Sequence, residues 1–271
     1  MTITPSTLPH LTAIGSGKGG TGKTLIAVSL AQALSREGER VLLCDADLGL
    51  SNAAVHLGLS ASGDLPALIG GARALEHCVV PVLGGAATEG GFDLIAAPSG
   101  SGALANAGAL TAENLVARLR GTRKYHRVLI DLAAGVDAPV MRFAAAADDA
   151  LLVLTPDPAS LTDAYAFAKL LLKATGTRLP RVIVNQSESE AEARRTAEAM
   201  TATCTAFLKA APAVLGRVPR DGQAHDAVRR QVPLFAQLPH GPAARALMAI
   251  AHALHAADNP ALQKNRLVSQ R

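Results

Sequence analysis

One run of eight residues constrains this chain more than any other feature: Gly17-Lys18-Gly19-Gly20-Thr21-Gly22-Lys23-Thr24. It has two glycines around four residues, followed by Lys and Thr, as phosphate-binding loops do. Glycine lets backbone N–H groups turn inward around an anion. Lys23 is then placed to neutralise the β- and γ-phosphates, and the Thr24 hydroxyl to bind Mg²⁺. The run predicts a strand–loop–helix unit that holds a nucleoside triphosphate.

A second pattern overlaps this loop and offers an alternative ligand. Gly15, Gly17 and Gly20 also satisfy the dinucleotide fingerprint, and Asp45 follows at a suitable distance. In a chain with 24 glycines a chance match of this kind is common. The adjoining Gly22-Lys23-Thr24 is much more specific. We therefore favour a nucleoside triphosphate over NAD.

Composition excludes several classes of protein. The 271 residues are 49% hydrophobic and 18% charged, which is typical of a globular domain. Aromatic residues make up only 3%, which argues against stacking surfaces for single-stranded nucleic acid. The net charge of +4 leaves non-specific DNA binding open as a disfavoured alternative. The three cysteines are far apart and form no CxxC pair, so neither a zinc ribbon nor a disulfide framework is expected.

No stretch of the chain reads as a targeting or membrane-spanning segment. The first residues lack a basic region followed by an apolar run, and no apolar stretch reaches the ~18 residues needed to cross a bilayer. We expect a cytoplasmic protein, or one that is polar or peripheral at the inner face of the membrane.

Buried apolar runs alternate with helical patterns along the chain, which predicts a single doubly wound α/β domain with a mostly parallel sheet flanked by helices. The domain is expected over 11–257, with a lead at 1–10 and a disordered basic tail at 258–271. Strands are expected at 11–14, 40–45, 92–97, 128–131, 150–155, 181–185 and 213–218, and short elements at 64–71 and 75–82. Helices are expected at 25–36, 110–119, 188–208 and 243–257. A further helix is expected to run to Lys173 from a cap at Ser160 or Thr162.

Acidic residues follow two of these strands. Asp45 and Asp47 come after the second, and Asp131 ends the apolar run Val128-Leu129-Ile130 like a Walker B acid. Ligands bind at the carboxyl ends of strands in open α/β sheets. A turn or helix cap that uses Asp47 or Asn52 remains an alternative. A basic run is expected to be a solvated helix end: Arg118, Arg120, Arg123, Lys124 and Arg127.

With these residues the chain resembles the MinD/ParA class of deviant-Walker ATPases, which are P-loop NTPases of the SIMIBI type. The extra lysine of that class corresponds to Lys18. Within the class the chain is most similar to the FlhG (FleN/YlxH) branch, which controls flagellar number and placement. Three passages carry this narrower resemblance: Asp45-Ala46-Asp47-Leu48-Gly49-Leu50-Ser51-Asn52, Thr155-Pro156-Asp157-Pro158-Ala159-Ser160-Leu161-Thr162-Asp163-Ala164-Tyr165 and Ala227-Val228-Arg229-Arg230-Gln231.

The resemblance implies a role for each matching residue. Lys18 would reach the partner's phosphates across an ATP-bound homodimer, since it has no evident task within its own subunit. Asp47 would position the attacking water. Thr24, Asp45 and Asp131 would organise Mg²⁺. The nucleotide would further contact these residues: Thr155, Asn185 and the backbone from Pro219 to Asp221.

The resemblance also implies a slow ATPase that works as a switch. Its partner would be an FlhF-like GTPase or a protein of the flagellar switch (C-ring). A MinD-like division regulator and a ParA-like partition ATPase remain alternatives. In the family, other residues occupy the two positions of the switch that Leu132 and Ala133 hold after the Walker B acid. One phosphate contact is therefore expected to be lost. Leu132→Thr is expected to raise the rate of ATP hydrolysis. The tail after Pro260 has no apolar stripe, so membrane contact is expected to be weak or indirect.

Overall fold

The computed structural model describes residues 8–47, 52–60, 63–97 and 109–258. Within them, eight strands form one sheet in the order β3-β4-β2-β5-β1-β6-β7-β8. Neighbouring strands are parallel, except that the edge strand β3 pairs antiparallel with β4. The strands are β1 (His10–Ser16), β2 (Val41–Ala46), β3 (Val80–Val82), β4 (Phe92–Ala96), β5 (Arg127–Ala134), β6 (Asp149–Leu154), β7 (Arg181–Ser187) and β8 (Val214–Pro219).

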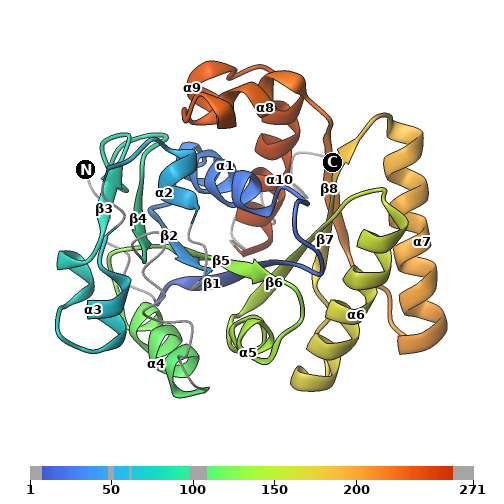
Figure 1. Ribbon diagram of the computed structural model, residues 1–271, viewed down its shortest axis with the longest axis horizontal. Helices are drawn as coiled ribbons and strands as arrows, with labels where there is room; N and C mark the ends of the chain where they lie inside the picture. Colours follow the sequence, from blue (N-terminus) through green and yellow to red (C-terminus); the bar gives the residue numbers. More distant parts are fainter. Residues whose placement is uncertain (1–7, 48–51, 61–62, 98–108, 259–271) are drawn as a thin grey trace, which may run out of the picture.

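Helices cover both faces of this sheet (Figure 1), which confirms the predicted doubly wound architecture. One face carries α1 and α10, and the other carries α4, α5 and α6. Each side has its own cluster of buried apolar side chains. The helices are α1 (Lys23–Arg36), α2 (Ala53–His56), α3 (Leu65–Ile69), the 3₁₀ turn η1 (Leu75–His77), α4 (Ala109–Arg120), α5 (Ala138–Ala146), α6 (Pro158–Thr175), α7 (Glu190–Leu208), α8 (Gly222–Arg229), α9 (Leu234–Gln237) and α10 (Pro242–Asp258).

All seven expected strands are present. Six of them are apolar runs that are largely buried in a sheet covered on both faces, whereas β8 lies at the edge of the sheet and is mostly half-exposed. The expected element at 75–82 is two elements, η1 and β3. Four helices were not expected: α2, α5, α8 and α9. The cap expected for α6 is wrong. Asp157 caps this helix by accepting the Ala159 N–H, whereas Ser160 accepts the Thr155 N–H.

The last helix packs as expected from its apolar stripe. Ala243, Leu247, Ile250 and Leu254 are buried, and α10 packs on α1 and β8. It ends at Asp258, one residue beyond the expected boundary, and the remainder of the expected tail lies outside the described residues. No described helix has both the length and the apolar character that crossing a membrane requires.

The interpretation of Arg127 as part of a solvated helix end is wrong. Its side chain is only 2% exposed at the first residue of β5. The guanidinium donates to both carboxylate oxygens of Glu39, at 2.7 and 3.0 Å, and contacts Asp258 at 2.8 Å. A buried guanidinium needs such pairing. Arg127 therefore connects the end of α10 to the end of the sheet where the strands begin. Asp45 and Asp131 lie at the opposite end, where the strands finish.

Candidate nucleotide-binding site

The phosphate-binding loop joins the end of β1 to the start of α1. Gly20 and Gly22 have φ angles of 78° and 82°, in the left-handed region that glycine adopts without strain. Gly22 occupies the N-cap of α1, so the positive end of the helix faces the loop. This is the arrangement expected of a loop that cradles phosphate.

Gly15 and Gly17 serve packing rather than a dinucleotide. A Cβ on Gly17 would lie 2.3 Å from the backbone carbonyl of Asp163, and one on Gly15 would lie 2.7 Å from the Phe167 ring. Both contacts are with α6, which presses directly against the loop. The close approach of α6 thus accounts for two of the three glycines of the competing dinucleotide pattern, whereas a Cβ on Gly20 would meet nothing within 4 Å.

Asp45 and Asp131 lie side by side at the carboxyl ends of β2 and β5, as paired residues in the parallel register. Both are 1% exposed. The Lys23 ammonium donates to Asp131 Oδ1 at 2.7 Å. Burial raises the pKa of Asp131 to about 6, although Lys23 opposes this shift. Three charged side chains of the predicted site therefore meet beneath the loop.

Asp45 anchors the segment that carries Asp47. Its carboxylate accepts the N–H of Asp47 at 3.1 Å and those of Asn52 and Ala53 at 2.9 Å each. The helix cap considered for Asn52 is in fact supplied by Asp45, because the Asn52 side chain makes no capping bond. The intervening part of the motif, 48–51, lies outside the described residues.

The donors at this point suit Mg²⁺. Two carboxylates and the Thr24 hydroxyl are hard oxygen ligands, and Asp131 Oδ2 is buried without a hydrogen-bond partner. No cluster of three or more His, Cys, Asp or Glu side chains suited to a metal occurs in the part of the chain that the structure describes. Mg²⁺ commonly takes one or two carboxylates and completes its shell with phosphate and water. The residues present therefore fit an ion that arrives with a nucleotide.

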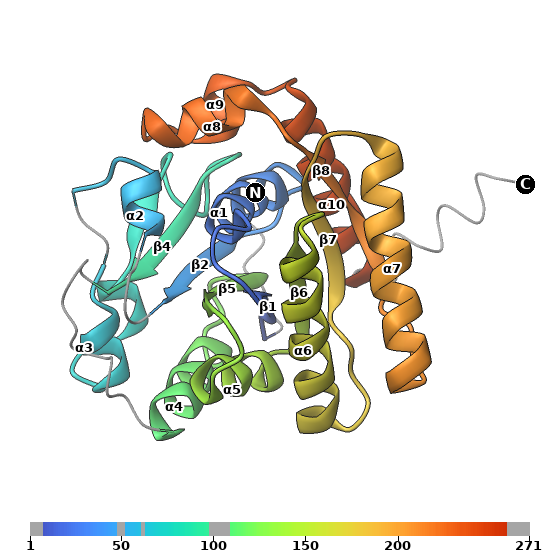
Figure 2. The same cartoon turned by 45° about the vertical axis from the view of Figure 1, so that its right-hand side comes forward.

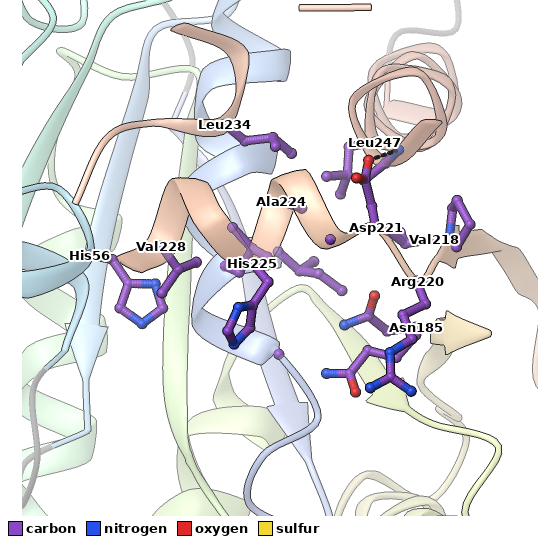
Figure 3. A pocket seen from close by; sticks show the side chains of 17 residues that line it. His56, Asn185, Val218, Arg220, Asp221, Ala224, His225, Val228, Leu234 and Leu247 are labelled. Atoms are coloured by element: carbon purple, nitrogen blue, oxygen red, sulfur yellow. Dashed lines mark hydrogen bonds between the residues drawn. The ribbon is translucent and has the colours of Figure 1, made fainter. Parts of the chain in front are cut away.

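A cavity of about 470 Å³ extends from the loop beneath α8 (Figure 3). Gly22, Asn185, Pro219 and Asp221 line it, so the residues assigned to the base surround one space. Asn185, which is 4% exposed, donates from its amide to the Thr21 carbonyl at 2.7 Å. The cavity is thus connected to the loop by a direct hydrogen bond.

Two residues shape the rim of this cavity in different ways. Asp221 accepts the N–H groups of Gln223 and Ala243, so its side chain holds the starts of α8 and α10 together. Gln186 donates to the Gly20 carbonyl at 3.2 Å and has a φ of 59°. Gln186 follows Asn185 directly in the sequence, but nothing in the sequence indicated its contact with the loop. Thr155 lies just beyond β6 and is not among the residues that line the cavity.

Lys18 has a partner in its own subunit, which corrects the expectation that it has no task there. Its ammonium contacts Asp157 Oδ2 at 2.5 Å, and both side chains are partly exposed. The hydrogen bond from Lys18 lowers the pKa of Asp157. The pair joins the loop to the first turn of α6.

Leu132 does not face the phosphate loop, so the expected loss of a phosphate contact there has no basis in the structure. The side chain is fully buried in the apolar cluster beneath α5 and α6. Its Cδ1 lies 3.7 Å from the position of a Cβ built on Gly15. Asp131 and Leu132 point to opposite faces of β5, as successive strand residues do.

Comparisons with known proteins agree with this geometry. The family described as CobQ/CobB/MinD/ParA nucleotide binding domain matches residues 12–234. The antiactivator FleN of Pseudomonas aeruginosa is 35% identical over 256 residues, which cover 94% of this chain and 89% of FleN. The flagellum site-determining protein YlxH of Helicobacter pylori is 33% identical over 159 residues, which cover 58% of this chain and 52% of YlxH.

Solved structures give the same result. The septum site-determining protein MinD of Pyrococcus horikoshii, complexed with Mg-ADP, superposes with a TM-score of 0.74 at 25% identity, over 91% of this chain and 96% of MinD. The MinD cell division protein of Aquifex aeolicus gives a TM-score of 0.73 at 26% identity, with coverages of 91% and 96%. By its sequence, its fold and the phosphate loop with its two buried acids, the chain belongs to the CobQ/CobB/MinD/ParA family of nucleotide-binding domains.

Proposed function

We propose that this protein is an ATP hydrolase that works as a switch, dimerises when ATP is bound, and regulates the number or placement of flagella. One observation carries the proposal. The phosphate loop, with Lys23 above two buried acids, opens through Gly22 into a cavity that reaches Asn185. Such a site has room for the phosphates at one end and the base at the other.

The residues of this chain divide the work of phosphoryl transfer. Lys23 leaves Asp131 and turns to the phosphates when a nucleotide enters the loop. Thr24, Asp45 and Asp131 would hold Mg²⁺, which would supply positive charge to the phosphates. Asp47 orients the attacking water. Phosphoryl transfer depends mainly on such positioning and charge neutralisation.

Dimerisation follows from an exchange of partners at Lys18. In the free subunit the ammonium pairs with Asp157. In the ATP-bound dimer it pairs with the phosphates held by a second copy of the chain. The exposed pair with Asp157 contributes little stability, so Lys18 can leave it at little cost in free energy.

The biological role rests on the relatives. FleN is named an antiactivator and YlxH a flagellum site-determining protein, and FleN aligns over nearly the whole chain. The partner would be an FlhF-like GTPase or a C-ring protein, reached in the cytoplasm or at the pole. A role in cell division is the alternative. It is supported by septum site-determining relatives such as Bacillus subtilis MinD, which is 30% identical over 178 residues.

Two experiments test this proposal. Purified protein should hydrolyse ATP in the presence of Mg²⁺, and Lys23→Ala should abolish hydrolysis, whereas Lys209→Ala, an exposed lysine at the end of α7, should not. In a deletion strain, flagella and septa are counted in the same cells. An altered number or position of flagella with normal septa supports the flagellar role. Misplaced septa with normal flagella would contradict it and favour the division role.

A further inference from the structure

The short helix α2 connects the nucleotide cavity to Asp45. His56, the last residue of α2, lines the cavity beside Val228 of α8 (Figure 3). Its backbone N–H donates to the Asn52 carbonyl at 2.9 Å. The Asn52 N–H in turn donates to Asp45 Oδ2 at 2.9 Å. One helical turn therefore separates an imidazole at the cavity from a carboxylate at the phosphate site.

One nitrogen of the His56 imidazole, Nδ1, is buried and has no hydrogen-bond partner among the described residues. Burial lowers the pKa of His56, while Asp45 and Lys23 act on it in opposite directions. A neutral imidazole can accept a hydrogen bond at one nitrogen and donate from the other. A buried polar atom without a partner costs free energy, which a ligand with a hydroxyl or amino group can recover.

A close contact also joins the residues that follow α2 to the residues that follow α8. Gly58 and Gln231 both adopt left-handed backbone, with φ angles of 62° and 57°. A Cβ on Gly58 would lie 2.9 Å from the Gln231 carbonyl oxygen. Gln231 ends α8 in this conformation, since its N–H donates to the Val228 carbonyl and the Val232 N–H donates to the Ala227 carbonyl. The segment after α2 therefore lies against the end of α8, which contributes residues to the lining of the cavity. Figure 2 shows α8 above α1 and α2.

We propose that His56 is a positioning residue, which engages the nucleoside part of the bound nucleotide and so sets the placement of Asp45 and Asp47. The proposal rests on the ATPase function proposed above and extends it. A triphosphate alone occupies the loop, whereas a nucleoside also occupies the cavity that His56 lines. A complete nucleotide also fixes α2, and through the Asp45 hydrogen bonds it fixes the segment that carries Asp47. ATP is then hydrolysed faster than inorganic triphosphate, which makes phosphate contacts only.

The test compares Mg-ATP with inorganic triphosphate and Mg²⁺, which has no nucleoside to engage the ring. His56→Leu should lower kcat for ATP by about tenfold while KM changes far less. With inorganic triphosphate, the variant and the wild-type protein should show the same rate. His56→Gln, which keeps a donor and an acceptor, should restore part of the kcat. Val55→Ala is the matched control, because Val55 lies on the same helix and is 44% exposed.

The outcomes separate this inference from the proposed function. If the wild-type protein does not hydrolyse ATP, the proposed function fails. If it does, and His56→Leu keeps the wild-type kcat, only the inference fails. Equal slowing of ATP and inorganic triphosphate hydrolysis, or slowing by Val55→Ala as well, would show that α2 is merely structural. Thermal unfolding of each variant establishes that the compared proteins are folded.

Discussion

Leu132 directly follows Asp131 on β5 and is fully buried. By its position after Asp131, a hydroxyl there would be expected to speed hydrolysis, but the side chain lies in the apolar core. Leu132→Thr should place an unpaired hydroxyl among apolar groups and lower the free energy of unfolding by about 1–3 kcal/mol. Urea unfolding of the two proteins measures this difference.

The same variant distinguishes the two interpretations of position 132. If Leu132→Thr leaves the unfolding free energy unchanged and raises the ATPase rate, the side chain acts at the phosphate site and the core assignment is wrong. Leu132→Val is a suitable companion, because it shortens the side chain without adding a polar group.

Individual residues were also the least predictable part of the molecule. That Lys23, Asp45 and Asp131 lie together beside the phosphate loop was predicted, because local sequence patterns place them at the ends of neighbouring strands and in the loop. Arg127 was not, because its burial depends on Glu39 and Asp258, which are distant in sequence. The contact between Lys18 and Asp157 within one subunit was also not predicted, because these residues are distant in sequence.

At the scale of elements, the strands were predictable and the short helices were not. Continuous apolar runs identify buried parallel strands without knowledge of their neighbours. The missed helix α5 does carry a local signal, since Asp137 precedes it and Pro139 lies in its first turn. The four-residue helices α2 and α9 carry too few residues for any periodicity, and tertiary contacts define them instead.

The packing of α6 on the phosphate loop leads to a second prediction. Gly17→Ala should force α6 away from the loop, because its Cβ would meet the Asp163 backbone at 2.3 Å. Overpacking of this kind costs about 1–3 kcal/mol. Gly19→Ala is the matched control in the same loop, since a Cβ there meets nothing within 4 Å. Thermal unfolding of the nucleotide-free proteins should show a lower midpoint for the first variant only, and equal midpoints would refute the packing argument.

At the scale of the whole molecule, a buried ionic network joins α10 to the edge of the sheet opposite the nucleotide site. Burial acts to raise the pKa of Glu39, but hydrogen bonds from His255 and Arg127 lower it from 4.5 to about 2. A carboxylate whose pKa is lowered in the folded state stabilises the fold at pH values above its pKa in the unfolded chain. This stabilisation is lost as the pH falls through the pKa of the folded state. The shift corresponds to stabilisation on the order of 3 kcal/mol, which disappears between about pH 4.5 and pH 2.

His255 gives this network a dependence on pH in the opposite direction. Its hydrogen bond to Glu39 raises its pKa above 6.5, against the effect of burial. The stabilisation is complete below that value and is lost as the pH rises through the folded-state pKa. His255→Gln should therefore flatten the decline in unfolding free energy above pH 6.5. His252 lies on the same helix as His255 and forms a more exposed pair with Glu37. His252→Gln should therefore leave the decline in unfolding free energy intact. Parallel pH curves for wild type and His255→Gln would contradict the assignment.

The central claim is that ATP converts the free subunit to a dimer by moving Lys18 from Asp157 to a second copy's phosphates. Light scattering of Asp47→Ala with ATP and Mg²⁺ tests it most directly, because this variant should bind ATP without hydrolysing it. We expect a species of twice the 27.7 kDa chain mass with ATP, and a monomer with ADP or after Lys23→Ala. A species of 27.7 kDa that persists with ATP at micromolar protein would contradict the account.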